Sequence, residues 1–309
     1  MTGTLWITGA AGWSGGHLIR MFAGRPDRPR LVGLDTAAEP AGLDAFGRID
    51  LCEPDEVAGL CARELPTWVI HLAAATPPAP QERMWQVNVG GTLGLLLGLA
   101  RGGARSVRVV SVGSAGEYEP SAGEILTESH PCGGSTPYGR SKFAQTLTAL
   151  EAGRTLGIPV VVARAFNLIG PGMPETLVAG ALCAQFARAR DGEEILVGNT
   201  KSARDFIDIR DAVAAYWALA RQGRPGEVYN VCTGTATTVE QLLELFRQAA
   251  GVRVSWRTDP ARLRAVDVAV SCGSPARIRA ATGWQAGIDP AATVRDMVVA
   301  VRRTDAEAE

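Results

Sequence analysis

The sequence feature that most constrains the fold is a glycine-rich turn near the N-terminus. The segment GAAGWSG, residues 9–15, contains three evenly spaced glycines, and it directly follows the apolar run Thr4–Thr8. Glycines let a chain turn sharply from a strand into a helix and let the backbone approach a pyrophosphate, whose charge meets unpaired N–H groups at the helix N-terminus. The turn therefore predicts a dinucleotide-binding site.

An acidic residue at a suitable distance supports this interpretation. The second apolar run, Arg30–Leu34, ends at Asp35, which lies 20 residues after Gly15. At this spacing a carboxylate can accept hydrogen bonds from the adenosine ribose, and it would repel the extra phosphate of NADP. We therefore expect NAD rather than NADP; the alternative is that Asp35 only caps a turn in solvent.

A further carboxylate follows Ile49 and could lie near the adenine amino group. The alternative is that Asp50 and Leu51 form an ordinary solvated end of a strand. The cofactor contacts predicted in this part of the chain are Gly9, Gly12, Trp13, Gly15, Asp35, Asp50 and Leu51.

Strand-like and helix-like segments alternate through the first half of the chain. Apolar runs at Thr67–Leu72, Val107–Val112 and Ile158–Ala165 are separated by the helix-length segments Gln86–Arg101 and Tyr138–Leu156. Such alternation implies right-handed crossovers and a parallel sheet. We predict an α/β fold with a Rossmann-type, doubly wound parallel sheet.

After about residue 166 the alternation loosens, which indicates a second, smaller lobe. We predict a dinucleotide-binding domain at residues 1–166, to which residues 207–232 return, and a substrate-binding lobe at residues 167–206 and 233–309. Thr238 is a plausible N-cap for a helix that runs to Ala250.

The motif YGRSK suggests proton transfer. Tyr138 and Lys142 are four residues apart at the start of a predicted helix and therefore lie on one face. We expect the ammonium to lower the pKa of the phenol from about 10, so that Tyr138 exchanges a proton at neutral pH, as hydride transfer at a carbinol carbon requires. Ser114 follows a predicted strand and would hydrogen-bond the same oxygen. Without a dinucleotide turn, this Tyr–Lys pair would more simply be a surface pair.

Composition argues against several other classes of protein. The 31 Lys+Arg and 32 Asp+Glu residues give no net basic charge to hold nucleic acid. The six cysteines form no C-x-x-C pair, so we predict neither a metal site nor disulfides. The first residues do not resemble a secretory signal, and no apolar run approaches the ~18 residues of a membrane span. We expect no membrane partner and a reduced, cytoplasmic location.

Taken together, the motifs resemble those of the extended short-chain dehydrogenase/reductases, the NAD-dependent epimerase/dehydratase family that acts on nucleotide sugars. The motifs that carry the resemblance are GAAGWSG, HLAAA at 71–75, NVGGT at 88–92, SVGSAGEY at 111–118, TPYGRSK at 136–142, RAFNLIGPG at 164–172 and ARDFIDIRD at 203–211. The segments RDFIDIRDAVAAYW, GEVYNVCTG, DPARLRAVDV and ATGW more narrowly resemble GDP-4-keto-6-deoxymannose reductases and their 4,6-dehydratase relatives.

The resemblance implies a role for each matching residue. It implies Ser114, Tyr138 and Lys142 as catalytic residues, with Lys142 also binding the nicotinamide ribose. The implied contacts to the nucleotide-diphosphate sugar are Asn167, Arg204, Arg264 and Asp267. For either arginine the alternative is a surface ion pair. The resemblance also implies a homodimer in which Gln86–Arg101 and Tyr138–Leu156 form a four-helix bundle with a second copy.

The reaction itself is left open among several possibilities. Dehydratases of this family carry acidic residues one or two places after the position of Ser114, where this chain has Ala115 and Gly116. Glu117, on a strand-like segment, would point to the opposite side, so dehydration is disfavoured unless this segment coils and turns Glu117 inward. We expect a 4-keto reductase, with a 4-epimerase that retains NAD as the alternative. A non-catalytic dinucleotide sensor and an enzyme for a non-nucleotide substrate are the other hypotheses.

Overall fold

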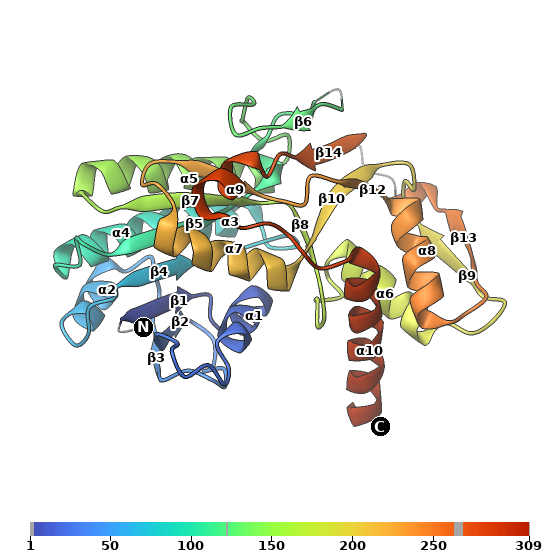
Figure 1. Ribbon diagram of the computed structural model, residues 1–309, viewed down its shortest axis with the longest axis horizontal. Helices are drawn as coiled ribbons and strands as arrows, with labels where there is room; N and C mark the ends of the chain where they lie inside the picture. Colours follow the sequence, from blue (N-terminus) through green and yellow to red (C-terminus); the bar gives the residue numbers. More distant parts are fainter. Residues whose placement is uncertain (1–2, 122, 263–267, 309) are drawn as a thin grey trace.

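The computed structural model describes residues 3–121, 123–262 and 268–308. Its centre is a seven-stranded sheet in the order β11-β7-β5-β4-β1-β2-β3, in which every neighbouring pair is parallel (Figure 1). The strands are β1 Thr4–Thr8, β2 Arg30–Asp35, β3 Ala45–Arg48, β4 Trp68–His71, β5 Arg108–Ser114, β7 Val160–Ala165 and β11 Val228–Val231. The predicted α/β fold with a Rossmann-type parallel sheet is confirmed.

Helices cover both faces of this sheet, because its strands are apolar on both sides. On β1, Leu5 and Ile7 pack against the face covered by α1 and α7, whereas Trp6 packs on the opposite face. The helices of this part are α1 Trp13–Met21, α2 Pro54–Cys61, α3 Gln81–Trp85, α4 Gly91–Arg101, α5 Pro137–Leu156 and α7 Ile209–Gln222. The segment Gln86–Gly90, predicted as the start of a regular helix, is a π-helical turn instead.

The smaller lobe is built around a second sheet in the order β12-β10-β14-β6, and β8 also pairs with β10. A separate pair joins β9 and β13. The strands are β6 Ile125–Leu126, β8 Asn167–Ile169, β9 Glu194–Val197, β10 Ala203–Asp208, β12 Ala236–Thr238, β13 Ser255–Thr258 and β14 Val270–Gly273; the helices are α6 Val178–Arg188, α8 Val239–Ala250 and α10 Pro290–Ala308.

A second apolar core holds this lobe together. Phe186 of α6 and Phe246 of α8 are fully buried, and their rings stack with centroids 5.9 Å apart. The predicted N-cap Thr238 is confirmed. Its hydroxyl accepts a hydrogen bond from the Gln241 N–H, and Oε1 of Gln241 accepts one from the Thr238 N–H. Figure 1 shows α10 projecting from this lobe, so the two chain ends lie in different lobes.

Two segments pack in a different lobe from the one predicted for them. Strand β6, within residues 1–166, pairs with β14 of the smaller lobe. Helix α9, Ala276–Thr282, instead packs Ile278 into the core of the large sheet, where the Trp284 indole donates to the Asp211 carbonyl. The lobes therefore exchange short pieces of chain.

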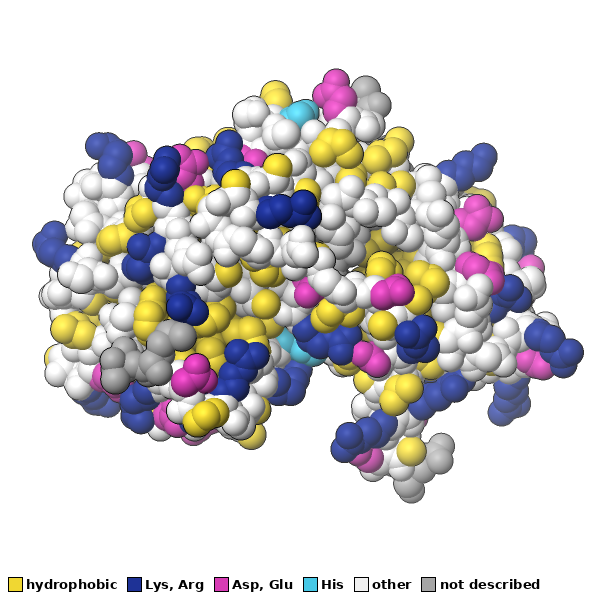
Figure 2. Space-filling view, viewed as in Figure 1, with side chains coloured by type: hydrophobic (Ala, Val, Ile, Leu, Met, Phe, Trp, Pro, Cys, Tyr) yellow, Lys and Arg dark blue, Asp and Glu magenta, His cyan; other side chains and the backbone are white. Residues whose placement is uncertain are grey.

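Within residues 3–121, 123–262 and 268–308, no helix combines the length and apolar character needed to cross a bilayer. On the face drawn in Figure 2, basic and acidic side chains are interspersed. Among the same residues, no cluster of three or more His, Cys, Asp or Glu side chains could hold a metal ion.

Candidate active site

The glycine turn lies where β1 passes into α1, and its geometry requires residues that have no side chain. Gly9 has φ 69°, in the left-handed region that favours glycine. A Cβ on Gly15 would overlap the Gly9 carbonyl oxygen, and one on Gly9 would overlap the backbone of Ala73. The N-cap Gly12 provides no side-chain cap, and the first turn of α1 has no acidic residue. These properties fit an anion at the helix N-terminus.

Asp35 lies at the end of β2, where its carboxylate supports the turn. One oxygen accepts the Ala11 N–H at 3.0 Å and the other the Ala37 N–H at 3.0 Å. Arg48, the register partner of Asp35 on β3, donates from Nε to the Thr36 carbonyl at 3.0 Å. Arg48 could not be predicted from the sequence, because the apolar run of β3 is too short to be recognised as a strand.

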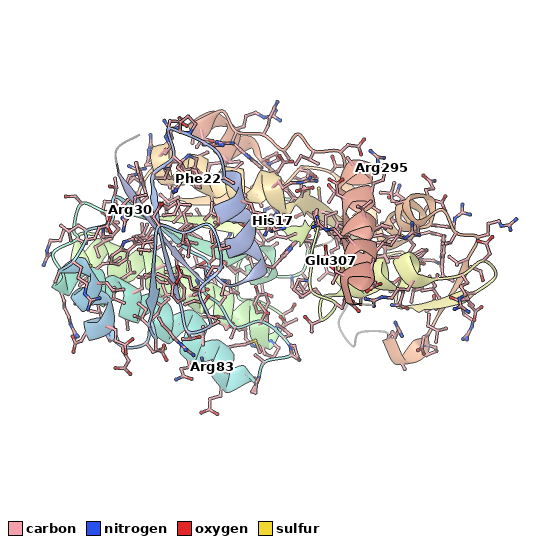
Figure 3. All side chains as sticks on the ribbon, turned by 90° about the horizontal axis from the view of Figure 1, so that it is seen from below. His17, Phe22, Arg30, Arg83, Arg295 and Glu307 are labelled. Carbon is pink, nitrogen blue, oxygen red and sulfur yellow. The ribbon has the colours of Figure 1, made fainter. Side chains whose placement is uncertain are left out.

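The other predicted cofactor residues have mainly structural contacts. The Trp13 indole N–H donates to the Pro171 carbonyl at 2.9 Å, and His17 Nε2 bonds the same oxygen at 2.9 Å. Figure 3 shows His17 on the side of α1 that faces the smaller lobe. Asp50 accepts the Cys52 N–H at 2.9 Å, and Leu51 packs against the core beneath α4. Trp13 therefore links the glycine turn to the loop after β8.

Ser114, Tyr138 and Lys142 meet at the carboxyl end of β5. Tyr138 lies in the first turn of α5, which Thr136 caps by accepting the Gly139 N–H at 3.0 Å, and Pro137 occupies a first-turn position. The Ser114 hydroxyl interacts with the phenol. Lys142, buried one turn further along, donates from Nζ to the Val112 carbonyl at 2.6 Å and to Gln145 Oε1 at 2.5 Å.

The electrostatics of this group differ from the sequence prediction. Burial raises the pKa of Tyr138 to about 12, the Ser114 hydroxyl lowers it, and the charge of Glu117 raises it. Burial lowers the pKa of Lys142 to about 8, against the charge of Glu117. The prediction that Lys142 lowers the pKa of Tyr138 is therefore wrong for the protein's own groups. Desolvation dominates, and the ammonium is bonded to Val112 and Gln145.

The segment after Ser114 does not continue as a strand. Ala115–Glu117 forms a 3₁₀ turn that brings the Glu117 side chain inward, to the buried Arg164 and away from solvent. A Cβ on Gly116 would lie 3.4 Å from Ser114 Oγ and 3.9 Å from a ring carbon of Tyr138. The expectation that this segment is strand-like is thus corrected. The position next to the Ser114 hydroxyl and the Tyr138 ring is Gly116, which has no side chain.

Two further buried polar groups, unassigned by sequence reasoning, hold the loop beside the glycine turn. Asn88, in the π-helical turn, donates to the Ala75 carbonyl at 3.1 Å and to Ser141 Oγ at 3.0 Å. His71 is bonded to the hydroxyls of Thr8 and Thr92, and burial lowers its pKa to about 3. The motifs HLAAA and NVGGT contain these two residues and were the available signal for them. A π-helical turn has no periodicity that could predict the contacts of Asn88 from the sequence.

The structure places two of the four implied substrate residues on neighbouring strands of the smaller lobe. Asn167 on β8 donates to the Asp205 carbonyl at 3.2 Å. Arg204 on β10 donates to the carbonyls of Ala203 at 2.8 Å and Val268 at 2.6 Å. Arg264 and Asp267 lie outside the described residues.

Comparison with known proteins decides the family. A model of the NAD dependent epimerase/dehydratase family matches residues 5–232. The chain belongs to this family. The predicted resemblance is confirmed, and so is the prediction of an NAD(P)-dependent enzyme of the short-chain dehydrogenase/reductase type.

Relatives of this epimerase/dehydratase family member span its whole length. It is similar to the GDP-6-deoxy-D-mannose reductase of Pseudomonas aeruginosa, with 36% identity over 97% of this chain and 96% of that protein. It is similar to a UDP-glucose 4-epimerase of Streptomyces lividans, with 29% identity over 96% of this chain and 95% of that protein. The structure of RMD from Pseudomonas aeruginosa complexed with NADPH aligns with a TM-score of 0.86 and 33% identity, over 98% of this chain and 99% of that one.

Gly15 at the end of the turn and the next residue of α1, Gly16, give a matched test of the dinucleotide site. A Cβ on Gly15 would meet backbone oxygens, whereas one on Gly16 would meet only the flexible end of Arg20. We expect Gly15→Ala to weaken NADH binding by about tenfold or more, or about 1.4 kcal/mol. Gly16→Ala should bind NADH like the wild-type protein. Fluorescence titration measures both, and equal affinities for the two variants would contradict the assignment.

Proposed function

We propose that this family member reduces the 4-keto group of a nucleotide-diphosphate 4-keto-6-deoxyhexose, and that GDP-4-keto-6-deoxymannose is the first substrate to test. The observation that carries the proposal is the Tyr138 phenol beside Ser114, whose pKa burial raises to about 12, at a site where Gly116 contributes no acidic side chain. Reduction needs an acid at this place. The similarity to a GDP-6-deoxy-D-mannose reductase supports the choice of substrate.

The residues of this chain divide the proton chemistry between them. A reduced nicotinamide, when bound, supplies the hydride that C4 receives. The Ser114 hydroxyl donates a hydrogen bond to the ketone oxygen, and Tyr138 gives that oxygen its proton as negative charge develops there. Lys142, held by Val112 and Gln145, stabilises the phenolate that remains. One C=O becomes one HC–OH, with one hydride and one proton consumed.

The diphosphate end of the substrate requires fixed donors and cations. We propose Asn167 and Arg204 on β8 and β10, together with Arg264, for the diphosphate, and Asp267 for the nucleoside ribose. A guanidinium can bind phosphate oxygens in a forked pair, which suits this role.

A 4-epimerase that retains NAD is the second candidate, favoured by Asp35 at the ribose position. An epimerase returns the hydride to the other face of C4 and has no need to exchange cofactor. Mass spectrometry of small molecules released by denaturing the purified protein separates the two. Release of NAD at unit stoichiometry favours the epimerase, whereas an empty site favours the reductase.

The proposed acid is tested with Tyr138→Phe. This change should lower kcat for 4-keto reduction by about 100- to 10,000-fold, the usual contribution of a general acid, and should leave NADH affinity nearly unchanged. Tyr229→Phe is the matched control, because the Tyr229 hydroxyl only accepts the Arg224 N–H at 3.0 Å. Consumption of NADH measures both. A Tyr138→Phe variant with full activity would rule out the assignment of proton transfer.

We propose that Asp35 makes NAD the preferred cofactor, with Arg48 as a cation beside it. Asp35→Asn keeps an acceptor for the Ala11 N–H but removes the negative charge. We expect the ratio of kcat/KM for NADPH to that for NADH to rise by about tenfold, or about 1.4 kcal/mol. Adding Arg48→Ala should reverse much of this gain. An unchanged ratio in Asp35→Asn would show that the carboxylate does not face the 2′ position.

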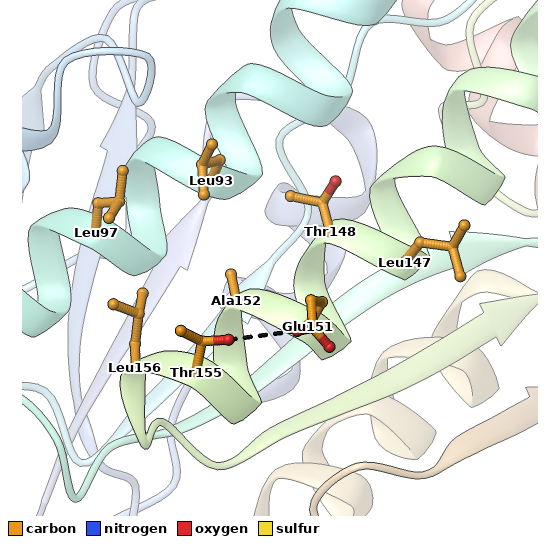
Figure 4. Close-up of a pocket in the computed structure, with 8 residues that line it drawn as sticks. All are labelled: Leu93, Leu97, Leu147, Thr148, Glu151, Ala152, Thr155 and Leu156. Atoms are coloured by element: carbon orange, nitrogen blue, oxygen red, sulfur yellow. Dashed lines mark hydrogen bonds between the residues drawn. The ribbon is translucent and has the colours of Figure 1, made fainter.

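We propose a homodimer formed through α4 and α5. Between these helices lies a groove of about 490 Å³, with Leu93, Leu97, Leu147 and Leu156 among its lining residues (Figure 4). Leu93 and Leu147 are 40% and 52% exposed, so the two helices together present an apolar face to water. A second copy would cover the same face, as a two-fold interface requires.

The interface is tested by Leu93→Glu combined with Leu147→Glu. Two carboxylates on the apolar face should convert a dimer into a monomer of the 32.5 kDa chain mass. Leu65→Glu, at a residue that is 54% exposed and outside α4 and α5, is the control and should stay dimeric. Light scattering after size-exclusion chromatography gives the masses. A wild-type protein that runs as a monomer would disprove the interface.

A further inference from the structure

Glu117 is a buried carboxylate that the proposed reaction does not use. Its side chain is fully buried, and it accepts the Ser114 N–H at 2.7 Å and the Thr146 hydroxyl at 2.9 Å. It also accepts Arg164 Nε at 3.0 Å and forms an ion pair with Arg164 Nη2 at 2.9 Å. Three of these contacts go to Oε2 and one goes to Oε1, so the carboxylate is held by Arg164, Thr146 and the Ser114 main chain rather than left open to a substrate.

Stability alone is a weak explanation for this pair. Removing two charges from water is costly, and their attraction in the interior often does no more than offset that cost. Arg164 is 3% exposed, and its Nη1 atom has no hydrogen-bond partner among the residues that the structure describes. The guanidinium lies over the Tyr118 ring, 4.5 Å from its centroid. The arrangement fixes the carboxylate without satisfying every polar atom.

The contacts of Glu117 join the elements that carry the proposed catalytic residues. Ser114 ends β5, and Thr146 lies on α5, one turn beyond Lys142 and on the same face as Tyr138. Arg164 lies on β7, in register with Gly113 of β5. A single carboxylate thus joins the strand that ends in Ser114 to helix α5, whose first turn contains Tyr138.

Close packing around the carboxylate leaves little freedom to the turn. A Cβ on Gly113 would overlap Glu117 Oε1, and one on Gly139 would overlap the Gly116 carbonyl. Within the turn, the Gly116 N–H donates to Ser114 Oγ at 3.1 Å. Since Oγ accepts there, the hydroxyl hydrogen of Ser114 stays available to be donated to another oxygen.

We propose that Glu117, fixed by Arg164 and Thr146, is a positioning residue that holds Ser114 in place relative to Tyr138. It acts through the Ser114 main chain and touches no reacting atom. This inference rests on the proposed function, in which both hydroxyls face the oxygen on C4. It also assigns Glu117 a role other than that of a dehydratase acid.

Substitutions are made in pairs, because a single change would leave an unpaired buried charge. Two such pairs separate the effect of the oxygen that accepts the Ser114 N–H from the effect of the Glu117 charge. Glu117→Leu with Arg164→Met removes both charges and the acceptor for the Ser114 N–H. Glu117→Gln with Arg164→Met also removes both charges but keeps an acceptor oxygen. Asp44→Asn with Arg28→Met is the control, an ion pair at the β2–β3 edge of the sheet.

We expect the three variants to differ in kcat and to have nearly the same KM. The Leu/Met variant should lose about 100-fold in kcat, the effect of misplacing a catalytic group by about 1 Å. The Gln/Met variant should recover most of that loss, and the control should match the wild-type protein. A folded Leu/Met variant with wild-type kcat overturns the proposal, and so does a Gln/Met variant as impaired as Leu/Met.

The pH profile gives a readout that a merely structural role would not move. Tyr138, Lys142, Tyr118, Cys132 and Arg164 are the ionisable groups around Glu117. The Glu117 charge raises the pKa of Lys142, so its removal lowers that pKa and Lys142 loses its charge at lower pH. The alkaline decline of kcat in the Gln/Met variant should therefore begin at lower pH.

Two measurements cover the remaining outcomes. If the Leu/Met variant does not fold, Gly113→Ala decides, because it crowds the carboxylate and leaves both charges; a wild-type kcat then overturns the proposal. The kinetic ratios are taken on whichever C4 substrate the wild-type protein turns over, so a failure of 4-keto reduction counts against the proposed function alone. A crystal structure of a folded variant without the acceptor, with Ser114 unmoved, would overturn the positioning role without any substrate.

Discussion

Backbone packing at the carboxyl edge of the large sheet is the constraint on which the site depends. A Cβ would overlap a neighbouring main chain at Gly9 against Ala73, at Gly15 against Gly9, and at Gly139 against Gly116. These contacts bring the start of α1, the start of α5 and the end of β5 to one edge. Parallel strands place their loops there, and small residues let the loops approach one another.

Burial then sets the chemistry that this edge can perform. Desolvation raises the pKa of Tyr138 and lowers those of Lys142 and His71, in each case favouring the neutral form. The phenol is therefore kept as an acid over the neutral range, which suits the delivery of a proton. Glu117, a buried carboxylate in this region, is paired with Arg164, and its charge acts on both Tyr138 and Lys142.

The smaller lobe is joined to this edge by a few polar contacts. The Pro171 carbonyl accepts hydrogen bonds from the side chains of Trp13 and His17 on α1, so the loop after β8 is held against the glycine turn. Asp208 at the end of β10 binds Arg210 and the Thr293 hydroxyl of α10. Through these contacts, β8 and β10, which carry Asn167 and Arg204, keep a fixed relation to the large sheet.

Local patterns in the sequence were sufficient for the parallel sheet, the glycine turn and the Tyr138–Lys142 spacing. Each of these depends on residues close together in the chain, whose periodicity and spacing can be read directly. The turn after Ser114 was also readable, because Ser-x-x-Glu is a capping-box pattern, yet the apolar strand before it suggested an extended chain. Short β3 and the π-helical turn at Asn88 left no comparable signal.

Contacts between distant residues decided the rest. That Lys142 bonds the Val112 carbonyl, that Arg48 lies beside Asp35, and that Glu117 binds Arg164 all depend on how strands and helices pack. The direction of the Tyr138 pKa shift followed from burial, which no spacing along the chain reveals. The sequence by itself determined which elements form and where the dinucleotide turn lies; the tertiary structure alone decided which charges are buried together, because desolvation depends on the surroundings in space.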